Sequence, residues 1–153
     1  MLLPIGGVAA ACSFLIALPS VEINTASPPP SLEGSALYVT TRPLPQSNAA
    51  LYAVNGKVLP LTAQRIPDPT FPLNVQISGL LDPYSSLSDA DASAIAKDLV
   101  VSARWDEDGN SQTRGENDLV GRALCGGEGG GCEVKLEGRG LTGRMLTRGA
   151  FKK

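Results

Sequence analysis

Short stretches in which apolar residues occupy every second position dominate the chain between residues 36 and 136. The clearest stretch covers residues 99–105, where Leu99, Val101, Ala103 and Trp105 fall on one side. A period of two is typical of a β-strand with one face on a hydrophobic core. Because large aromatic side chains anchor such cores, we expect Trp105, the only tryptophan, to be at least three-quarters buried.

The residues after Trp105 predict a reversal of the chain. The segment 106–110 combines Asp106 and Asp108, whose side chains can bond nearby backbone amides, with Gly109, which is free to adopt a positive φ. Residues 119–121 are then expected to re-enter the sheet as the next strand.

Further strands are expected where β-branched, aromatic or alternating residues lie between turn signals. The expected strands are residues 36–41, 51–54, 58–63, 73–77, 134–136 and 141–147. Asn55-Gly56 predicts a hairpin turn, and Pro60 predicts an edge strand or a bulge. Residues 66–69 and 138–140 are expected to be turns.

One short helix is expected within residues 88–99. Ser88 followed by Asp89 and Asp91 is a capping-box-like start that places acid at the helix N-terminus, and Lys97 lies near the other end. Together with about seven strands, this predicts an all-β fold, either a sandwich or an open barrel with Greek-key or meander connections.

The N-terminal residues are strongly apolar. Residues 2–18 contain no charged side chain, a pattern shared by membrane spans and by signal-peptide cores. The run approaches the roughly 20 residues that cross a bilayer, and no basic residue precedes it. We therefore favour a retained transmembrane helix over a cleaved signal peptide.

Four parts of the chain follow from this pattern. Residues 1–19 are expected to be a membrane anchor, and residues 20–35, which contain Pro28-Pro29-Pro30, a semi-rigid linker. Residues 36–148 are expected to form the β-sandwich domain, and residues 149–153 a basic tail. The linker would hold the folded domain away from the membrane.

The composition excludes several classes of chemistry. The chain contains no histidine, so it cannot supply a Ser-His-Asp or Cys-His catalytic set or a His-ligated metal centre. Its net charge of −2 and its motifs give no sign of a nucleic-acid partner. We therefore predict a protein that is not an enzyme and has no cofactor.

One acidic segment resembles only the opening of a calcium-binding EF-hand loop. Asp106, Asp108 and Asn110 match its first ligands, but Ser111 stands at the glycine position and Asn117 at the final glutamate position. The segment is therefore predicted to be a hairpin turn without a metal. An enzyme that uses Asp106 or Asp108 as a base would lack a partner acid or metal.

Two of the three cysteines flank a glycine-rich loop. Cys125 and Cys132 lie seven residues apart, which fits neither a redox Cys-x-x-C pair nor a zinc half-site. We predict a disulfide between them if the domain is in an oxidising compartment, and two free thiols otherwise.

Several short motifs occur in a definite order along the middle of the chain. They are residues 37–43, 59–65, 71–75, 100–104 with Asp108-Gly109, and 118–121, and they cover about residues 37–121. Their order resembles the C-terminal domain of CycH-type cytochrome c biogenesis proteins. The resemblance implies a cupredoxin-like or immunoglobulin-like β-sandwich, an extracytoplasmic location, and a role in presenting apocytochrome c to the ligation machinery.

Anchor, linker and domain together predict a function without catalysis. We expect a single-pass membrane protein whose domain, on the thylakoid lumenal or periplasmic side, is an accessory subunit docked on a larger membrane complex. A photosystem is one host of this kind. The alternative is an apocytochrome-binding module in cytochrome c maturation.

Overall fold

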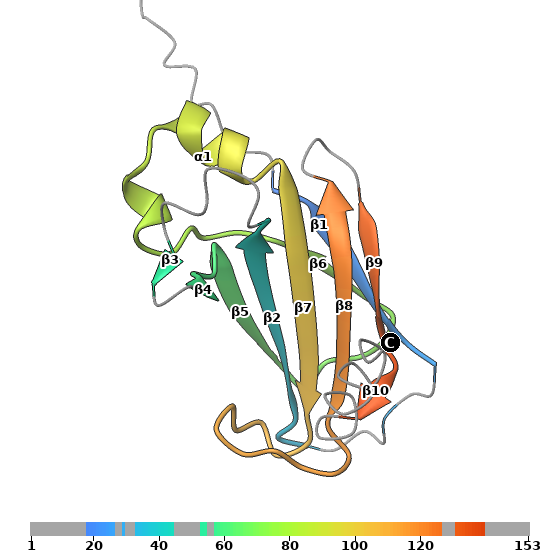
Figure 1. Ribbon diagram of the computed structural model, residues 1–153. Coiled ribbons are helices and arrows are strands. Elements are labelled where there is room, and N and C mark those ends of the chain that lie inside the picture. The colour runs from blue at the N-terminus through green and yellow to red at the C-terminus, as the bar shows by residue number, and fades with distance from the viewer. Residues whose placement is uncertain are drawn as a thin grey trace, which may run out of the picture.

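The computed structural model describes residues 18–26, 29, 33–44, 53–54, 57–126 and 131–139. Within these ranges, eight strands form two sheets that pack face to face, and two short strands form a separate hairpin. Figure 1 shows the two layers, with a helix at one end and the turn segment after β7 at the other. The prediction of a mainly β protein with a sandwich-like core is therefore confirmed.

The larger sheet has five strands in the order β10-β8-β7-β2-β5, and every neighbouring pair is antiparallel. These strands are β2 (Ala36–Pro43), β5 (Thr62–Pro67), β7 (Asp98–Asp106), β8 (Leu119–Gly126) and β10 (Gly138–Arg139). The central strand, β7, contains the alternating stretch of residues 99–105. The strands predicted at residues 36–41, 99–105 and 119–121 are all present.

The smaller sheet has three strands in the order β6-β1-β9. They are β1 (Ser20–Thr25), β6 (Leu73–Gln76) and β9 (Cys132–Leu136). The strand β1 runs antiparallel to β6 and parallel to β9, so the first described strand joins two segments that are far apart in sequence.

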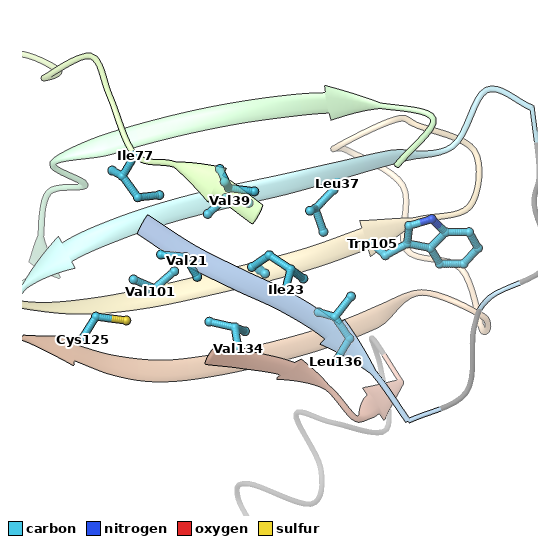
Figure 2. Close-up of a cluster of buried hydrophobic side chains, with 12 residues drawn as sticks. Val21, Ile23, Leu37, Val39, Ile77, Val101, Trp105, Cys125, Val134 and Leu136 are labelled. Atoms are coloured by element: carbon cyan, nitrogen blue, oxygen red, sulfur yellow. The ribbon is translucent and has the colours of Figure 1, made fainter. Parts of the chain in front are cut away.

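The main core lies between the two sheets, where side chains from both layers point toward one another (Figure 2). Its buried members are Val21, Ile23, Leu37, Val39, Val75, Ile77, Val101, Ala103, Trp105, Cys125, Val134 and Leu136. Trp105 is 1% exposed, which confirms its predicted burial. The apolar residues of β7 therefore alternate because one face of the strand packs on this core.

A second, smaller core closes the end of the sandwich. The 3-10 helix η2 (Tyr84–Ser86) and the helix α1 (Asp89–Ile95) cover it, as Figure 1 shows at the α1 end. The Ser88 hydroxyl caps α1 by accepting a hydrogen bond from Asp91 N at 3.2 Å. The short helix predicted from this cap is confirmed.

Several predicted boundaries differ from the structure. The strand expected at residues 58–63 is divided into β4 (Lys57–Val58), which pairs with β3 (Ala53–Val54), and β5, with Pro60 in the break. Proline lacks the amide that a continuous ladder needs. Residues 66–67 belong to β5 rather than to a turn, and Gly138 pairs with Val120 in β10 rather than turning.

The linker predicted at residues 20–35 overlaps the first strand of the folded domain. Residues 20–25 form β1, with Val21 and Ile23 fully buried, and the pairing with β6 continues N-terminally. Ile77 N donates to Pro19 O at 3.3 Å, and Gln76 Nε2 donates to Leu18 O at 3.1 Å. The described part of the domain therefore includes Leu18, which packs against both cores, and residues 18–25 are not a linker.

The predicted anchor at residues 2–18 and the strand predicted at 141–147 lie largely or wholly outside the described residues, as does the basic tail. In the part of the chain that is described, no helix is both long and apolar enough to cross a bilayer.

A disulfide joins the two sheets. Cys125, buried on β8, is bonded to Cys132 at the start of β9, and their Cα atoms are 5.5 Å apart. The bond therefore bridges the layers at the point where the chain passes from one sheet to the other.

Candidate docking face

The outward side of the five-stranded sheet carries four arginines. Because Leu37, Val39, Val101 and Ala103 point into the core, their strand neighbours point outward. The register places these outward positions side by side across four strands. We call this surface the arginine face and define it by Tyr38, Arg42, Arg65, Arg104 and Arg122.

Tyr38 lies between two of the arginines. It is directly opposite Arg65 on β5 and Arg104 on β7 in the register of the sheet. The guanidinium carbons lie 5.9 Å (Arg65) and 5.4 Å (Arg104) from the centre of its ring. At such distances a cation is attracted to the ring face, so Tyr38 brings two positive charges close together.

The turn after β7 holds the Tyr38 and Arg65 side chains in place through hydrogen bonds. The Tyr38 hydroxyl donates to Gly109 O at 2.6 Å and accepts from Arg65 Nε at 3.2 Å. Gly109 has a φ of +70°, and a Cβ at this position would collide with Gly34 O. A glycine is therefore needed where the turn approaches the sheet, as its predicted positive φ implies.

The other two arginines hold only weak or neutral partners. Arg122 Nε donates to Ser102 Oγ at 3.3 Å, and Arg42 Nη1 lies 3.5 Å from Thr40 Oγ1. Among the described residues, no carboxylate forms an ion pair with Arg42, Arg65 or Arg122. Their positive charges thus remain available to a partner.

An apolar spot lies beside these charges. Leu124 on β8 is 63% exposed and pairs with the half-buried Val100 on the same face. Arg122 lies two residues away on β8, and Arg42 lies opposite Val100, so this apolar contact is flanked by two of the arginines. The face is therefore suited to a partner that offers acidic groups around a small apolar contact.

The opposite side of the sandwich has a different charge. On the outer side of the three-stranded sheet, Glu22 on β1 lies next to Glu133 on β9, and Lys135 is the one basic residue among the described strand positions there. The overall charge of −2 therefore conceals a basic surface on one sheet and a mildly acidic one on the other.

Asp106 closes one end of the arginine face. Its Oδ2 accepts from Arg104 Nη2 at 2.7 Å, and the carboxyl is 1% exposed. Burial, followed by the hydrogen bond to Asp108 and the nearby charge of Asp118, raises the pKa of Asp106 to about 6, although Arg104 opposes the shift. Among the described residues no donor reaches Asp106 Oδ1, so the Asp106 carboxyl bonds Asp108 only when it is protonated and acts as the donor.

The neighbouring aspartates organise the turn. Asp108 accepts from Asn110 N at 2.9 Å and from the Thr113 hydroxyl at 2.6 Å, while Asp118 accepts from Glu107 N and Gly115 N. The hydrogen bonds to Asp106, Thr113 and Asn110 lower the pKa of Asp108 to about 2. The predicted hairpin-like turn, with aspartates bonding the backbone, is confirmed.

The Asp106 carboxyl is held within the turn rather than presented at the surface. Its pKa near 6 would suit proton transfer, but the carboxyl is 1% exposed and paired with Arg104. In the described ranges, no group of three or more His, Cys, Asp or Glu side chains is placed to hold a metal ion. The cluster therefore acts on the shape of the turn.

Sequence reasoning missed the arginine face. The four arginines are spread over residues 42–122 and alternate with core residues in four different strands. A period-two reading of each strand places its arginine on the outward side, but only the strand order brings the arginines together.

Comparisons with known proteins add no relatives. No family model matches the chain, nor does any curated protein or solved structure. The resemblance to the CycH-type domain therefore stays a prediction.

Proposed function

We propose that this protein is a non-catalytic accessory subunit, anchored in the membrane by residues 2–18, that docks on a larger membrane complex through the arginine face. The observation that carries the proposal is that three of the four arginines on this face, Arg42, Arg65 and Arg122, form no ion pair with any described carboxylate, in a chain whose net charge is −2. The proposed location is the thylakoid lumenal or periplasmic side, where a disulfide such as Cys125–Cys132 persists. The finer fold assignment, cupredoxin-like or immunoglobulin-like, is also part of the proposal.

The short distance between anchor and domain supports a protein partner. Leu18 packs on both cores and Pro19 continues the pairing with β6, so the domain is held at the end of the proposed anchor. The arginine face runs along the strands, and β1 begins at the α1 end of the sandwich (Figure 1). If the domain were attached to the membrane at this end, its strands would run away from the membrane. The arginine face would then face a neighbouring subunit rather than the membrane.

Capture of the full-length protein from its own membranes tests the proposal. We expect the wild-type protein, tagged and solubilised in mild detergent, to retain subunits of one complex, and photosystem subunits among them would identify that host. Arg42→Gln combined with Arg122→Gln should reduce this retention about tenfold, and added salt should have the same effect, because exposed charges are screened.

A matched variant separates the face from overall charge. Lys97→Gln combined with Lys135→Gln removes the same charge from exposed positions outside the arginine face and should leave retention unchanged. Equal loss in both variants would contradict docking through this face. Capture of unfolded cytochrome polypeptide in place of an assembled complex would favour the apocytochrome-binding alternative.

A further inference from the structure

We propose that β5 is the site at which an extended acidic segment of the partner adds to the five-stranded sheet as an antiparallel strand. The partner's location rests on the proposed function, but the strand addition itself rests only on the backbone of β5 and on the charge beside it.

The position of β5 leaves one of its sides unpaired. It is the edge strand of the sheet and pairs with β2 alone. At the opposite edge, β10 has only two residues, so β5 is the longer of the two edges in the described sheet. An unpaired edge presents backbone donors and acceptors to any strand that approaches it.

The register identifies which groups are open. Asp68 N donates to Ser35 O at 2.9 Å, and this pair continues the register of β5 with β2. In an antiparallel ladder such bonded pairs recur at every second residue, so Gln64 and Ile66 also face β2. The backbone groups of Ala63, Arg65 and Pro67 therefore point away from β2.

None of these groups forms a backbone hydrogen bond with another described residue. Ala63 and Arg65 each offer an amide and a carbonyl, and Pro67 offers a carbonyl alone. All three residues are exposed. The open edge thus has the alternating donors and acceptors that an added strand requires.

The positive charge of Arg65 favours an acidic strand as the one that adds to β5. Arg65 belongs both to this edge and to the arginine face, where its guanidinium is 5.9 Å from the Tyr38 ring. In an added antiparallel strand, the residue opposite Arg65 lies on the same face and exchanges both backbone bonds with it. An acidic residue there would contact Arg65 while its own amide donates to β5.

The same geometry disfavours a second copy of this chain. Antiparallel pairing of β5 with another β5 would place two Arg65 side chains opposite or diagonal to one another on one face, and such like-charge pairs are repulsive. Pro67 also removes one of the amides that such pairing would use. The edge is thus protected against self-association but remains open to an acidic strand.

A peptide with blocked ends and roughly eight residues, alternating glutamate and threonine, tests the proposal on the full-length protein in detergent. We expect its binding to slow hydrogen exchange at the Ala63 and Arg65 amides and to leave exchange at Gln64, already directed at β2, unchanged. Exchange that stays fast at Ala63 and Arg65 at saturating peptide, or no detectable binding, would overturn the proposal.

Methylated peptides supply the matched control. If glutamate lies opposite Arg65, N-methyl groups on the glutamate amides remove the bonds to β5 and should weaken binding about tenfold or more. N-methyl groups on the threonine amides, which point outward, should have little effect although the charge is identical. Equal effects would contradict strand addition.

Two more results separate this proposal from its alternatives. Arg65→Gln should weaken the glutamate peptide about tenfold, whereas a peptide of glutamine and threonine should bind equally weakly to both proteins. A dimer in sedimentation at the concentrations used would instead support self-pairing. Docking through the arginine side chains does not require an added strand, so failure here leaves the capture experiment unaffected.

Discussion

At the scale of single residues, Trp105 and Asp106 are adjacent in sequence but have opposite roles. Trp105 ends the row of core side chains on β7 and is 1% exposed (Figure 2). Asp106 points to the other side of the sheet, where it is paired with Arg104 and buried beneath the turn. One residue thus stabilises the sandwich, and the other sets the electrostatics at the end of the arginine face.

Trp105→Ala should lower the free energy of unfolding by about 3–5 kcal/mol, because it removes a fully buried aromatic side chain and leaves a cavity. Denaturant titration followed by circular dichroism measures the loss. Leu124→Ala, at a position that is 63% exposed, is the control and should change stability by less than about 0.5 kcal/mol. A small loss for Trp105→Ala would contradict its place in the core.

Asp106 should make stability depend on pH with an unusual sign. Its pKa is raised from 3.8 to about 6 in the folded protein, so between about pH 4 and 6 the folded state binds more protons than the unfolded state. Stability should therefore fall as the pH rises through this window, by on the order of 2 kcal/mol. Denaturation midpoints at a series of pH values measure the slope.

Asp106→Asn tests the assignment of that slope. The variant cannot titrate at this position and should show a flatter profile between about pH 4 and 6. Asp108 acts at lower pH and in the opposite direction, since its pKa is lowered to about 2. An unchanged slope in Asp106→Asn would assign the dependence to another group.

At the scale of elements, the stability of the sandwich depends on links between segments that are distant in sequence. The parallel pairing of β1 with β9 connects the first and ninth strands, and the disulfide connects β8 to β9 across the layers. The arginine face is likewise assembled from β2, β5, β7 and β8.

Removal of the disulfide should cost about 2.5 kcal/mol by the loop-entropy estimate for a short loop. The double variant Cys125→Ala with Cys132→Ala removes the bond that joins the sheets, and its denaturation midpoint is compared with that of the wild-type protein under oxidising conditions. Reduced wild-type protein is the control and should match the variant. Free thiols in protein isolated from its native compartment would contradict the predicted bond.

At the scale of the whole molecule, the domain begins where the proposed anchor ends. Leu18 and Pro19 already contact the sandwich, so the linker predicted at residues 20–35 does not begin before β1. With residues 2–18 as the proposed anchor, these contacts would restrict the orientations in which the arginine face meets the proposed partner.

Two truncations test this boundary. A chain that starts at Leu18 should fold and unfold cooperatively, because it keeps β1 and its contacts with β6 and β9. A chain that starts at Ala26 should fail to fold, since it loses the fully buried Val21 and Ile23 and leaves two strands of the smaller sheet without their shared neighbour. Dispersion of amide signals in NMR spectra measures both outcomes.

Equal folding of the two chains would contradict the role of β1. If the chain from Leu18 folds but no longer stays with its complex, the anchor raises the effective concentration of a weak contact, as expected for a tethered domain. Full retention of that chain would show that the anchor is dispensable for docking.

The sequence by itself determined the local elements whose signals lie within a few neighbouring residues. The alternation in residues 99–105 specifies a strand and the side that Trp105 faces, and Ser88 with Asp91 specifies the start of α1. The turn after Asp106 follows equally from its aspartates and Gly109. Such features depend on the backbone period and on short-range hydrogen bonds, which a single segment contains.

The tertiary structure decided everything that depends on which strands are neighbours. The residues of β1 alternate between buried and exposed, but they adjoin the proline-rich segment and were therefore predicted to be part of the linker. They form a strand because they pair with β6 and β9. The arginine face and the open edge of β5 likewise arise from strand order and register. Because pairing partners are selected by long-range packing, one strand's sequence states which side faces the core but not which strand lies next to it.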